Sequence, residues 1–524
     1  MAEVNEFFGK QVMSSQTPLP FGKWRSFFWP VYKHELKVLI PMLIMFFLIA
    51  FNYNLLRIAK DAMVVTAKSS GADAIPFLKT WAVLPMAFLM TFLFTRLSNK
   101  FKFERVFYLM MGLFLGFYAL FAFMLYPIHD FLHPHALADR FENILTPGCH
   151  GLVAIFRNWT FTAFYVMSEL WSTAIMTVLF WGFANQITSV SAAKRFYVIL
   201  SIGGNASSIF SGTLSTLISD WGIQLGGADL WGNSIKILTT IVLLAGIATL
   251  IIFRWLNRQV LNSPSSSSFH YEKEKAEVKM GLRKNFAYLL KSPYLLCVAI
   301  IVLTYNIAIN LTEVVWKDQL HLLCPNPNDY QAHMGKVSIG IGIMATIMAI
   351  FSGSLLRRFS WTVGAMIPPL ILLITGSAFF SFLIFKDSGL STLAVMLGTT
   401  PLIMGIFCGS AQNCLSRASK YTLFDTTKEL AFIPLNQESK LKGKAAIDGI
   451  GSRLGKSGSA VIFFFLLAPL GSVAASVPYV ALILLLIVVA WMIAVRSLGK
   501  QFNQVMNTKE DPATTSKKIE ALIQ

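Results

Sequence analysis

Basic side chains recur in a stretch of the chain that is otherwise apolar enough to cross a membrane. Four basic and two acidic residues lie between Asn52 and Trp81, namely Arg57, Lys60, Lys68, Lys79, Asp61 and Asp73. A basic residue at the centre of a membrane helix costs roughly 2.5–3.5 kcal/mol on insertion scales and by default indicates a functional site. The alternative is that Arg57, Lys60 and Lys79 extend their side chains to the membrane surface.

Polar residues also interrupt later apolar segments. Glu169 lies in the middle of FYVMSELWSTA, with Tyr165 one helical turn before it, and Glu313 ends an apolar run in NLTEVVWKD. Two further segments carry polar stripes at helical spacing, Ser201-Asn205-Ser208-Gly212-Ser215 and Lys444-Asp448-Ser452-Lys456-Ser459, the second with Arg453 beside it. Such stripes are also typical of surfaces on which membrane helices pack, and that alternative stays open.

Several basic groups and a few acids in a membrane protein favour a polyanionic substrate. Basic side chains neutralise phosphate or carboxylate groups, while nearby acids hold or tune them. A carrier of a neutral solute has no need of Lys79, Arg453 and Lys456 along its path. We therefore expect a transporter of a polyanion, without catalytic residues.

The composition sets the class of protein. Of 524 residues, 55% are hydrophobic and 13% charged, which is typical of an α-helical membrane protein with many spans. The net charge of +18 would also suit a nucleic-acid-binding protein, but no such motif is present, so no nucleic acid is expected. We predict twelve spans, near 36–56, 77–97, 106–126, 160–186, 196–219, 234–254, 293–314, 337–357, 361–385, 392–415, 447–469 and 475–495.

The distribution of basic residues predicts that both termini are cytoplasmic. In that topology 32 of the 44 Lys and Arg residues lie in inner segments and 10 in outer segments, as the positive-inside rule requires. Four of those 10 are the basic residues between Asn52 and Trp81. The predicted parts are a cytoplasmic segment 1–35, a six-helix bundle 36–254, a polar cytoplasmic linker 255–292, a second six-helix bundle 293–495 and a tail 496–524.

The two halves resemble each other. Asn54-Leu55…Lys60-Asp61 recurs as Asn310-Leu311…Lys317-Asp318, 256–257 residues later, and the fifth and eleventh spans are both rich in Gly and Ser. Both halves begin on the same side of the membrane, which indicates a parallel repeat. This is the arrangement of major-facilitator-type transporters, an all-α fold that holds its substrate near the midplane.

Three other patterns were weighed. GIGSRLGKSG lacks the first glycine of a phosphate-binding loop, because Ile450 occupies that position, so an ATPase is not expected. Four histidines (His129, His133, His135, His150) and Cys149 lie in one outer loop, but their loose spacing does not indicate a metal site. Cys149 and Cys324 both fall on the outer side, which leaves a disulfide open.

Several long phrases resemble the ATP/ADP translocase family, the nucleotide transporters of plastids and obligate intracellular bacteria. They are KDAMVVTAKSSGADAIPFLKTW, LHPHALADR, FYVMSELW, VLFWGFANQIT, INLTEVVWK, KYTLFDTTKELAFIPL and KGKAAIDGIGSRLGKSG. The resemblance runs from about Lys33 to Arg496. The signature of the mitochondrial carriers is not found in this sequence.

This resemblance implies exchange of external ATP for internal ADP, with phosphate accompanying ADP in some members. The family's important charged residues correspond to Lys79, Glu169, Glu313 and Lys456, and the asparagine associated with phosphate co-transport corresponds to Asn205. The family also contains proton-coupled importers of other nucleotides. No transit peptide is recognised at the N-terminus, so we expect a bacterial inner membrane. We also expect a functional monomer, with membrane lipids around it.

These observations lead to a hypothesis for binding. Lys79 and Lys456 neutralise the phosphates, assisted by Arg57, Lys60, Lys444 or Arg453, and Tyr165 stacks on the adenine. Glu169 and Glu313 hold the lysines while the site is empty. A membrane-embedded transferase is the alternative from another class, but the clustered catalytic residues that it requires are not found.

Overall fold

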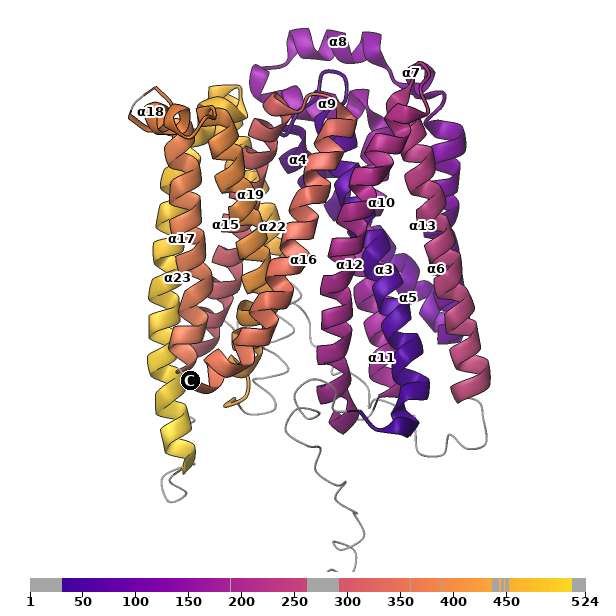
Figure 1. The fold of residues 1–524 in the computed structure, drawn as a ribbon, viewed down its shortest axis with the longest axis vertical. Helices are drawn as coiled ribbons and strands as arrows, with labels where there is room; N and C mark the ends of the chain where they lie inside the picture. The colour runs from indigo at the N-terminus through magenta and orange to yellow at the C-terminus, as the bar shows by residue number, and fades with distance from the viewer. Residues whose placement is uncertain are drawn as a thin grey trace, which may run out of the picture.

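The computed structural model describes residues 31–188, 190–261, 292–358, 360–387, 389–435, 443, 447 and 452–510. Every regular element in these ranges is a helix, and the long helices run nearly parallel in two groups (Figure 1). The all-α prediction is therefore confirmed. The linker between the predicted bundles lies for the most part outside the described residues.

The first half builds long helical segments, several of which contain a wider π-helical turn. Its elements are α3 (Leu36–Val65), α4 (Ala74–Phe77) continuing through η2 (Leu78–Val83) into α5 (Leu84–Lys100), α6 (Phe103–Leu120) with η3 (Phe121–Leu125), α10 (Trp159–Trp171) with η5 (Ser172–Phe180) and α11 (Trp181–Ile187), α12 (Val190–Gln224), and α13 (Leu230–Trp255) with η6 (Leu256–Leu261).

The second half follows the same order of long helices. Its elements are α15 (Pro293–Leu323), α16 (Pro327–Arg358), α17 (Trp361–Ile384), the short α18 (Gly389–Met396), α19 (Pro401–Ser419) continuing through η8 (Lys420–Phe424) into α20 (Asp425–Ala431), α22 (Ser452–Leu470) and α23 (Val473–Glu510). The helix that begins at Pro401 thus runs past the predicted end of the tenth span at residue 415. This difference matters for the site.

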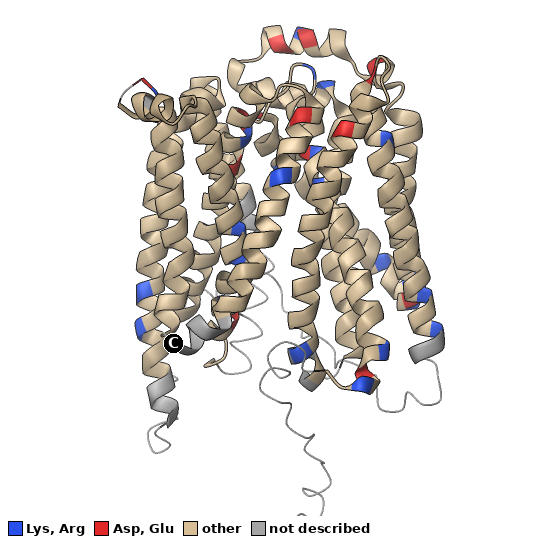
Figure 2. Ribbon diagram, in the orientation of Figure 1, with Lys and Arg blue, Asp and Glu red and all other residues tan. Residues whose placement is uncertain are grey.

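Nine helical segments in the described part of the chain are long and apolar enough to cross a membrane. The predicted spans of α12, α19 and α22 are not among them, and in α22 the apolar stretch of the described part, Ser457–Leu470, is too short. The count of twelve crossings stays a prediction for these three. Figure 2 shows Lys and Arg at the lower ends of several helices, the end predicted to face the cytoplasm.

The halves meet where α12 packs against α16. An added Cβ on Gly335 would lie 2.7 Å from the carbonyl oxygen of Gly212, so only glycine permits this approach. Ser338 donates a hydrogen bond to the carbonyl oxygen of Ser208 (3.1 Å), and Gln331 donates to that of Ser215 (3.3 Å). The Gly/Ser stripe of the fifth span is therefore a packing surface between the halves. The two helices diverge toward their lower ends (Figure 1).

A second contact between the halves joins α4 and η2 to α22. The rings of Phe77 and Phe464 meet edge to face, 6.0 Å apart between centroids. Gly148, in η4 (Pro147–Cys149), lies so close to α22 that an added Cβ would be 2.6 Å from the carbonyl oxygen of Leu467. Both contacts between the halves therefore include the ends of these helices that are predicted to face outward.

Short helices cover this outer end, with α8 lying across it (Figure 1). They are α7 (His129–Leu132), α8 (His135–Ile144) and α9 (His150–Arg157). The His150 ring bridges two carboxylates, Nδ1 to Asp73 at 2.7 Å and Nε2 to Glu142 at 3.2 Å. Arg157, which is 2% exposed, pairs with Glu142 at 2.6 Å and Asp139 at 2.5 Å. These pairs fasten the outer loop to the turn between α3 and α4.

We expect this attachment to weaken with rising pH. The hydrogen bond to Asp73 raises the pKa of His150 above its usual value, and the carboxylate of Glu142 adds to the rise, while Arg157 opposes it. A raised folded-state pKa means that the stabilisation is present in full below the ordinary value and is lost as pH rises through the folded value. His150→Gln should therefore lower the melting temperature at pH 6 and have a smaller effect at pH 8.5. Thermal unfolding in detergent measures both, and an equal loss at both values would contradict the expectation.

Candidate polyanion-binding site

Side chains from both halves line a cavity of about 400 Å³ between the bundles. This volume lies in the range of small-molecule sites, roughly 300–1,000 Å³. Seven basic and four acidic residues take part in the lining: Arg57, Lys60, Lys79, Lys317, Arg417, Lys420, Lys428, Asp61, Glu169, Glu313 and Asp425. The lining therefore has a formal excess of three positive charges, as a site for a polyanion requires.

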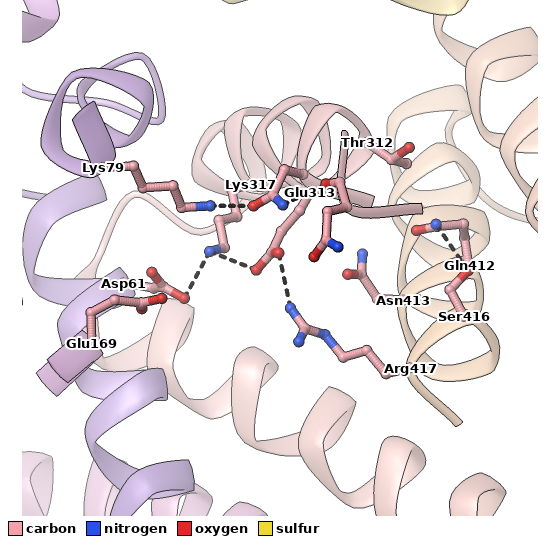
Figure 3. Close-up of polar contacts among 12 residues, drawn as sticks. Asp61, Lys79, Glu169, Thr312, Glu313, Lys317, Gln412, Asn413, Ser416 and Arg417 are labelled. Carbon is pink, nitrogen blue, oxygen red and sulfur yellow. Dashed lines mark hydrogen bonds and ion pairs between the residues drawn. The ribbon is translucent and has the colours of Figure 1, made fainter. Parts of the chain in front are cut away.

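A chain of ion pairs crosses the cavity from one half to the other (Figure 3). It begins at Glu169 on α10, whose carboxylate lies 3.3 Å from the ammonium of Lys60. Lys60 also pairs with Asp61 at 2.9 Å, and Asp61 lies 2.8 Å from the ammonium of Lys317 on α15. Glu313 then joins Lys317 to Arg417 on α19, at 2.9 Å from each. Three cations and three carboxylates thus balance one another.

The internal repeat explains why these ion pairs can join the two halves. Arg57 and Asp61 lie one turn apart on α3, and Glu313 and Lys317 occupy positions exactly 256 residues later on α15. The sign of the charge is reversed at both positions. The carboxylate of Asp61 therefore meets an ammonium group, Lys317, at the corresponding position of the other half.

Of the four cavity cations outside this row of ion pairs, Lys420 and Lys428 have carboxylate partners of their own, whereas Arg57 and Lys79 have none among the described residues. Arg57 is 9% exposed and has no hydrogen bond or ion pair within the described part of the chain. The ammonium of Lys79 donates a hydrogen bond to Oδ1 of Asn310 at 2.5 Å, and no described carboxylate pairs with it. A buried cation without a compensating charge is costly. Arg57 and Lys79 are therefore the groups best placed to bind an anion.

Comparison with known proteins identifies the family of this protein. The family model "TLC ATP/ADP transporter" matches residues 14–502. The chain belongs to this family.

Related transporters match nearly the whole chain. "ADP,ATP carrier protein 1" of Chlamydia pneumoniae is 45% identical over 94% of this chain and 96% of its own length. "ADP,ATP carrier protein 1, chloroplastic" of Arabidopsis thaliana is 44% identical over 91% of this chain and 75% of its own length.

Solved transporter structures share the fold. A bacterial homologue of the iron transporter ferroportin, in an inward-facing state, matches with a TM-score of 0.52 at 12% identity and covers 90% of this chain and 100% of its own. A D-xylose-proton symporter matches with a TM-score of 0.51 at 12% identity and covers 86% of this chain and 97% of its own. The major-facilitator type of fold predicted from the sequence is confirmed.

Most residues predicted for the site of this TLC ATP/ADP transporter line the cavity. They are Arg57, Lys60, Lys79, Tyr165, Glu169 and Glu313. Arg453 and Lys456 belong to α22 by their backbone, but the placement of their side chains lies outside the described part, as does the whole of Lys444. Glu169 pairs with Lys60, and Glu313 pairs with Lys317 and Arg417. The sequence led us to expect both acids to hold Lys79 and Lys456. Neither acid forms an ion pair with Lys79 in the described part of the chain, and the expected pairing with Lys456 stays a prediction because that side chain lies outside the described part.

Asn205 lies elsewhere in the transporter. It is on α12, and an added Cβ on Gly342 of α16 would lie 2.9 Å from its carbonyl oxygen. It is not among the described residues that line the cavity. Its predicted connection with phosphate stays a prediction.

Sequence reasoning missed part of the cavity wall. Asp61 was noted as an acidic residue beside the basic ones but was not predicted for the site, while Lys317 and Asn310 were visible only as members of the repeated segments. The contribution from the end of α19, η8 and α20 was missed as well, namely Arg417, Lys420, Tyr421, Asp425 and Lys428. Their signal was spacing: Arg417, Lys420 and Tyr421 recur at three and four residues, as on one face of a helix.

The outer cysteines and histidines do not form the sites that were weighed. Cys149 and Cys324 are both free thiols. Among the described residues, no group of three or more His, Cys, Asp or Glu side chains is arranged to hold a metal ion. His150 is engaged with two carboxylates, and His133 lies 2.7 Å from the hydroxyl of Thr160.

Proposed function

We propose that this chain exchanges ATP for ADP across the inner membrane of a bacterium by alternating access. The observation that carries the proposal is the cavity between the halves, with its excess of positive charge and the unpaired cations Arg57 and Lys79. The chlamydial relatives, which carry the name ADP,ATP carrier protein, support both the substrates and the bacterial membrane. The chain would act as a monomer, because one cavity lies within a single pair of bundles.

The ion pairs suggest how the uptake of one nucleotide is coupled to the release of another. Asp61 and Lys317 join the halves, and this contact opposes the rocking that would expose the cavity to the other side. A polyphosphate brings its own negative charges, which compete with Asp61 and Glu313 for Lys317 and Arg417. Rocking would then proceed readily only with a nucleotide bound.

Charge balance makes phosphate a reasonable companion of ADP. ATP carries one negative charge more than ADP at neutral pH, so one-for-one exchange moves net charge unless a further anion accompanies ADP. We therefore include co-transport of inorganic phosphate in the proposal. Asn205 is the residue that the resemblance connects with it.

Counter-substrate dependence tests the proposal directly. Purified protein in proteoliposomes should take up labelled ATP when the vesicles contain ADP, and uptake should be close to background when they contain buffer alone. Uptake that needs a proton gradient but no internal nucleotide would instead indicate a proton-coupled importer. Running the assay with other nucleotides and with labelled phosphate defines the substrates.

Asn205→Ala provides a separate expected result. If this amide serves phosphate, the variant should lose several-fold more of its labelled phosphate movement than of its ATP/ADP exchange, and both are measured in the same vesicles. Ser201→Ala is a control on the exposed part of the same helix. Equal loss of nucleotide and phosphate movement would mean that Asn205 supports the packing of α12 on α16 instead.

A further inference from the structure

The cavity contains two groups built from a lysine, a tyrosine and a carboxylate. In the first half, the Lys60 ammonium lies 3.7 Å from the centre of the Tyr165 ring and 3.3 Å from Glu169. In the second half, the Lys420 ammonium lies 4.9 Å from the centre of the Tyr421 ring and 3.5 Å from Asp425.

The internal repeat relates these two groups. Tyr421 and Asp425 follow Tyr165 and Glu169 by 256 residues, the same interval that separates Arg57 from Glu313. The lysines differ in origin: Lys60 comes from α3, whereas Lys420 directly precedes its tyrosine in η8. The two tyrosines therefore occupy corresponding positions in different surroundings.

Only one of the two rings is accessible. Tyr165 is fully buried, so the face under Lys60 has no room for a further ring. Tyr421 is 43% exposed and lines the cavity. The other aromatic residues in the described lining are less exposed, namely Tyr53, Tyr305 and Phe424.

We propose that Tyr421 is the platform on which the nucleotide base stacks, and that Tyr165 is a buried support for Lys60. This inference rests on the proposed function and names the base end of the same site. Stacking on an aromatic face holds a base through dispersion and burial and tolerates different bases. Tyr421 also lies in a π-helical turn, a departure from regular helix that is frequent at functional sites.

The position of Tyr421 gives the nucleotide a direction in the cavity. Phe424, in the same turn, packs against Tyr305 of α15 in a tilted arrangement, with 4.5 Å between the ring centres. Asn310, which holds Lys79, lies five residues further along α15, about 8 Å along the helix axis, and Lys317 lies about 18 Å along it. A base at Tyr421 therefore directs the phosphates toward Lys79 and the ion pairs.

Charges beside the platform agree with this direction. Arg417 and Arg57 are both close enough to Tyr421 to interact with it electrostatically. They supply positive charge beside the platform, where the sugar and the first phosphate of a nucleotide stacked on Tyr421 would lie. Lys420 lies over part of the ring, and its ion pair with Asp425 would keep it nearby when a base takes its place.

Binding to the purified full-length protein separates the base from the phosphates. ATP and inorganic tripolyphosphate are titrated while thermal stabilisation is measured, for the wild type and for Tyr421→Leu, Tyr421→Phe and Tyr479→Leu. Tyr479 is the matched control, a tyrosine 52% exposed on α23 and outside the described cavity lining. Tyr421→Leu should weaken ATP binding by roughly 5- to 150-fold, the range measured for loss of one base-stacking aromatic, while tripolyphosphate binding stays within about twofold.

The remaining variants make the outcome decisive. Tyr421→Phe keeps the ring and should bind ATP within about twofold of the wild type, as should Tyr479→Leu. Unchanged ATP binding by Tyr421→Leu, or an equal loss of ATP and tripolyphosphate, would overturn the platform and leave the proposed function intact. A wild-type protein that no nucleotide stabilises would remove the proposed function and the platform together.

Discussion

Removing both partners of the ion pair between the halves, in Asp61→Asn/Lys317→Gln, is expected to convert strict exchange into leak. The pair joins α3 to α15 at 2.8 Å, and both side chains are at most 2% exposed. Without it the empty carrier should change sides without a nucleotide. Since 1.4 kcal/mol already corresponds to tenfold in an equilibrium, the ratio of leak to exchange should rise about tenfold or more.

The double variant is the informative one because each single variant leaves a buried charge with less compensation. Breaking a buried pair by removing one partner costs roughly 3–5 kcal/mol, whereas replacing both is often close to neutral for stability. Lys317→Gln alone leaves Asp61 with Lys60, and Glu313 with Arg417. We therefore expect the single variants to be the less stable proteins.

Efflux of labelled ADP from preloaded proteoliposomes measures the leak, with and without nucleotide outside. Glu35→Gln/Arg195→Gln is the matched control, because it removes a short ion pair (2.5 Å) that joins two segments of the same half. Efflux without external nucleotide should stay at the wild-type rate in the control. If it also stays there in Asp61→Asn/Lys317→Gln, the pair does not restrain the empty carrier.

The fold was predictable because a membrane imposes the length and the apolarity of each helix. The prediction was weakest at α12 and α19, where Gly, Ser, Asn and Gln residues reduce the contrast with loops. These are also helices at the contact between the halves or beside the cavity. The polar residues through which such a helix packs or lines the cavity also lower its hydropathy, so a search for apolar runs finds it less easily.

The site was predictable where a charge interrupts an apolar run, as at Lys79, Glu169 and Glu313. Site residues that follow the end of an apolar run were not predictable. Arg417 and Lys420 follow the apolar part of α19, and basic residues there look the same as those of a cytoplasmic loop. Only the continuation of the helix through η8 into α20 brings them to the cavity.

Contacts between residues of different helices were the feature least predictable from the sequence. Helical spacing shows which residues share a face of one helix, but not which helix stands opposite. Asp61 and Lys317 are far apart in the sequence, and their contact requires the rotational relation between the two repeats. For the same reason the packing of the Gly/Ser stripe against α16 could not be predicted from the spacing of its residues.

Lys79→Gln is the second variant for which we expect a large effect, a loss of ATP exchange of about 100-fold. A hydrogen bond to a charged group contributes roughly 1.5–3 kcal/mol, or about 10- to 150-fold in binding. Lys79 should lie near the upper end of this range, because no described carboxylate shares its charge and Asn310 already aims its ammonium group. Arg57→Gln, which removes the other unpaired cation, should behave similarly.

The loss should depend on the charge of the substrate. A cavity with one cation fewer disfavours ATP more than ADP, so the ratio of ATP uptake to ADP uptake should fall in both variants. Lys79→Arg keeps the charge and should retain a substantial part of the exchange. Lys236→Gln, on the exposed face of α13 and outside the described lining, is the matched control and should exchange at the wild-type rate.

Initial rates of labelled ATP and ADP uptake into ADP-loaded proteoliposomes, normalised to reconstituted protein, measure these effects. Equal losses for both nucleotides, with no recovery in Lys79→Arg, would mean that Lys79 acts through its bond to Asn310 in holding the halves together. A selective loss for ATP that Lys79→Arg repairs requires the charge itself. In that case the excess of cations over carboxylates in the cavity is what distinguishes a triphosphate from a diphosphate.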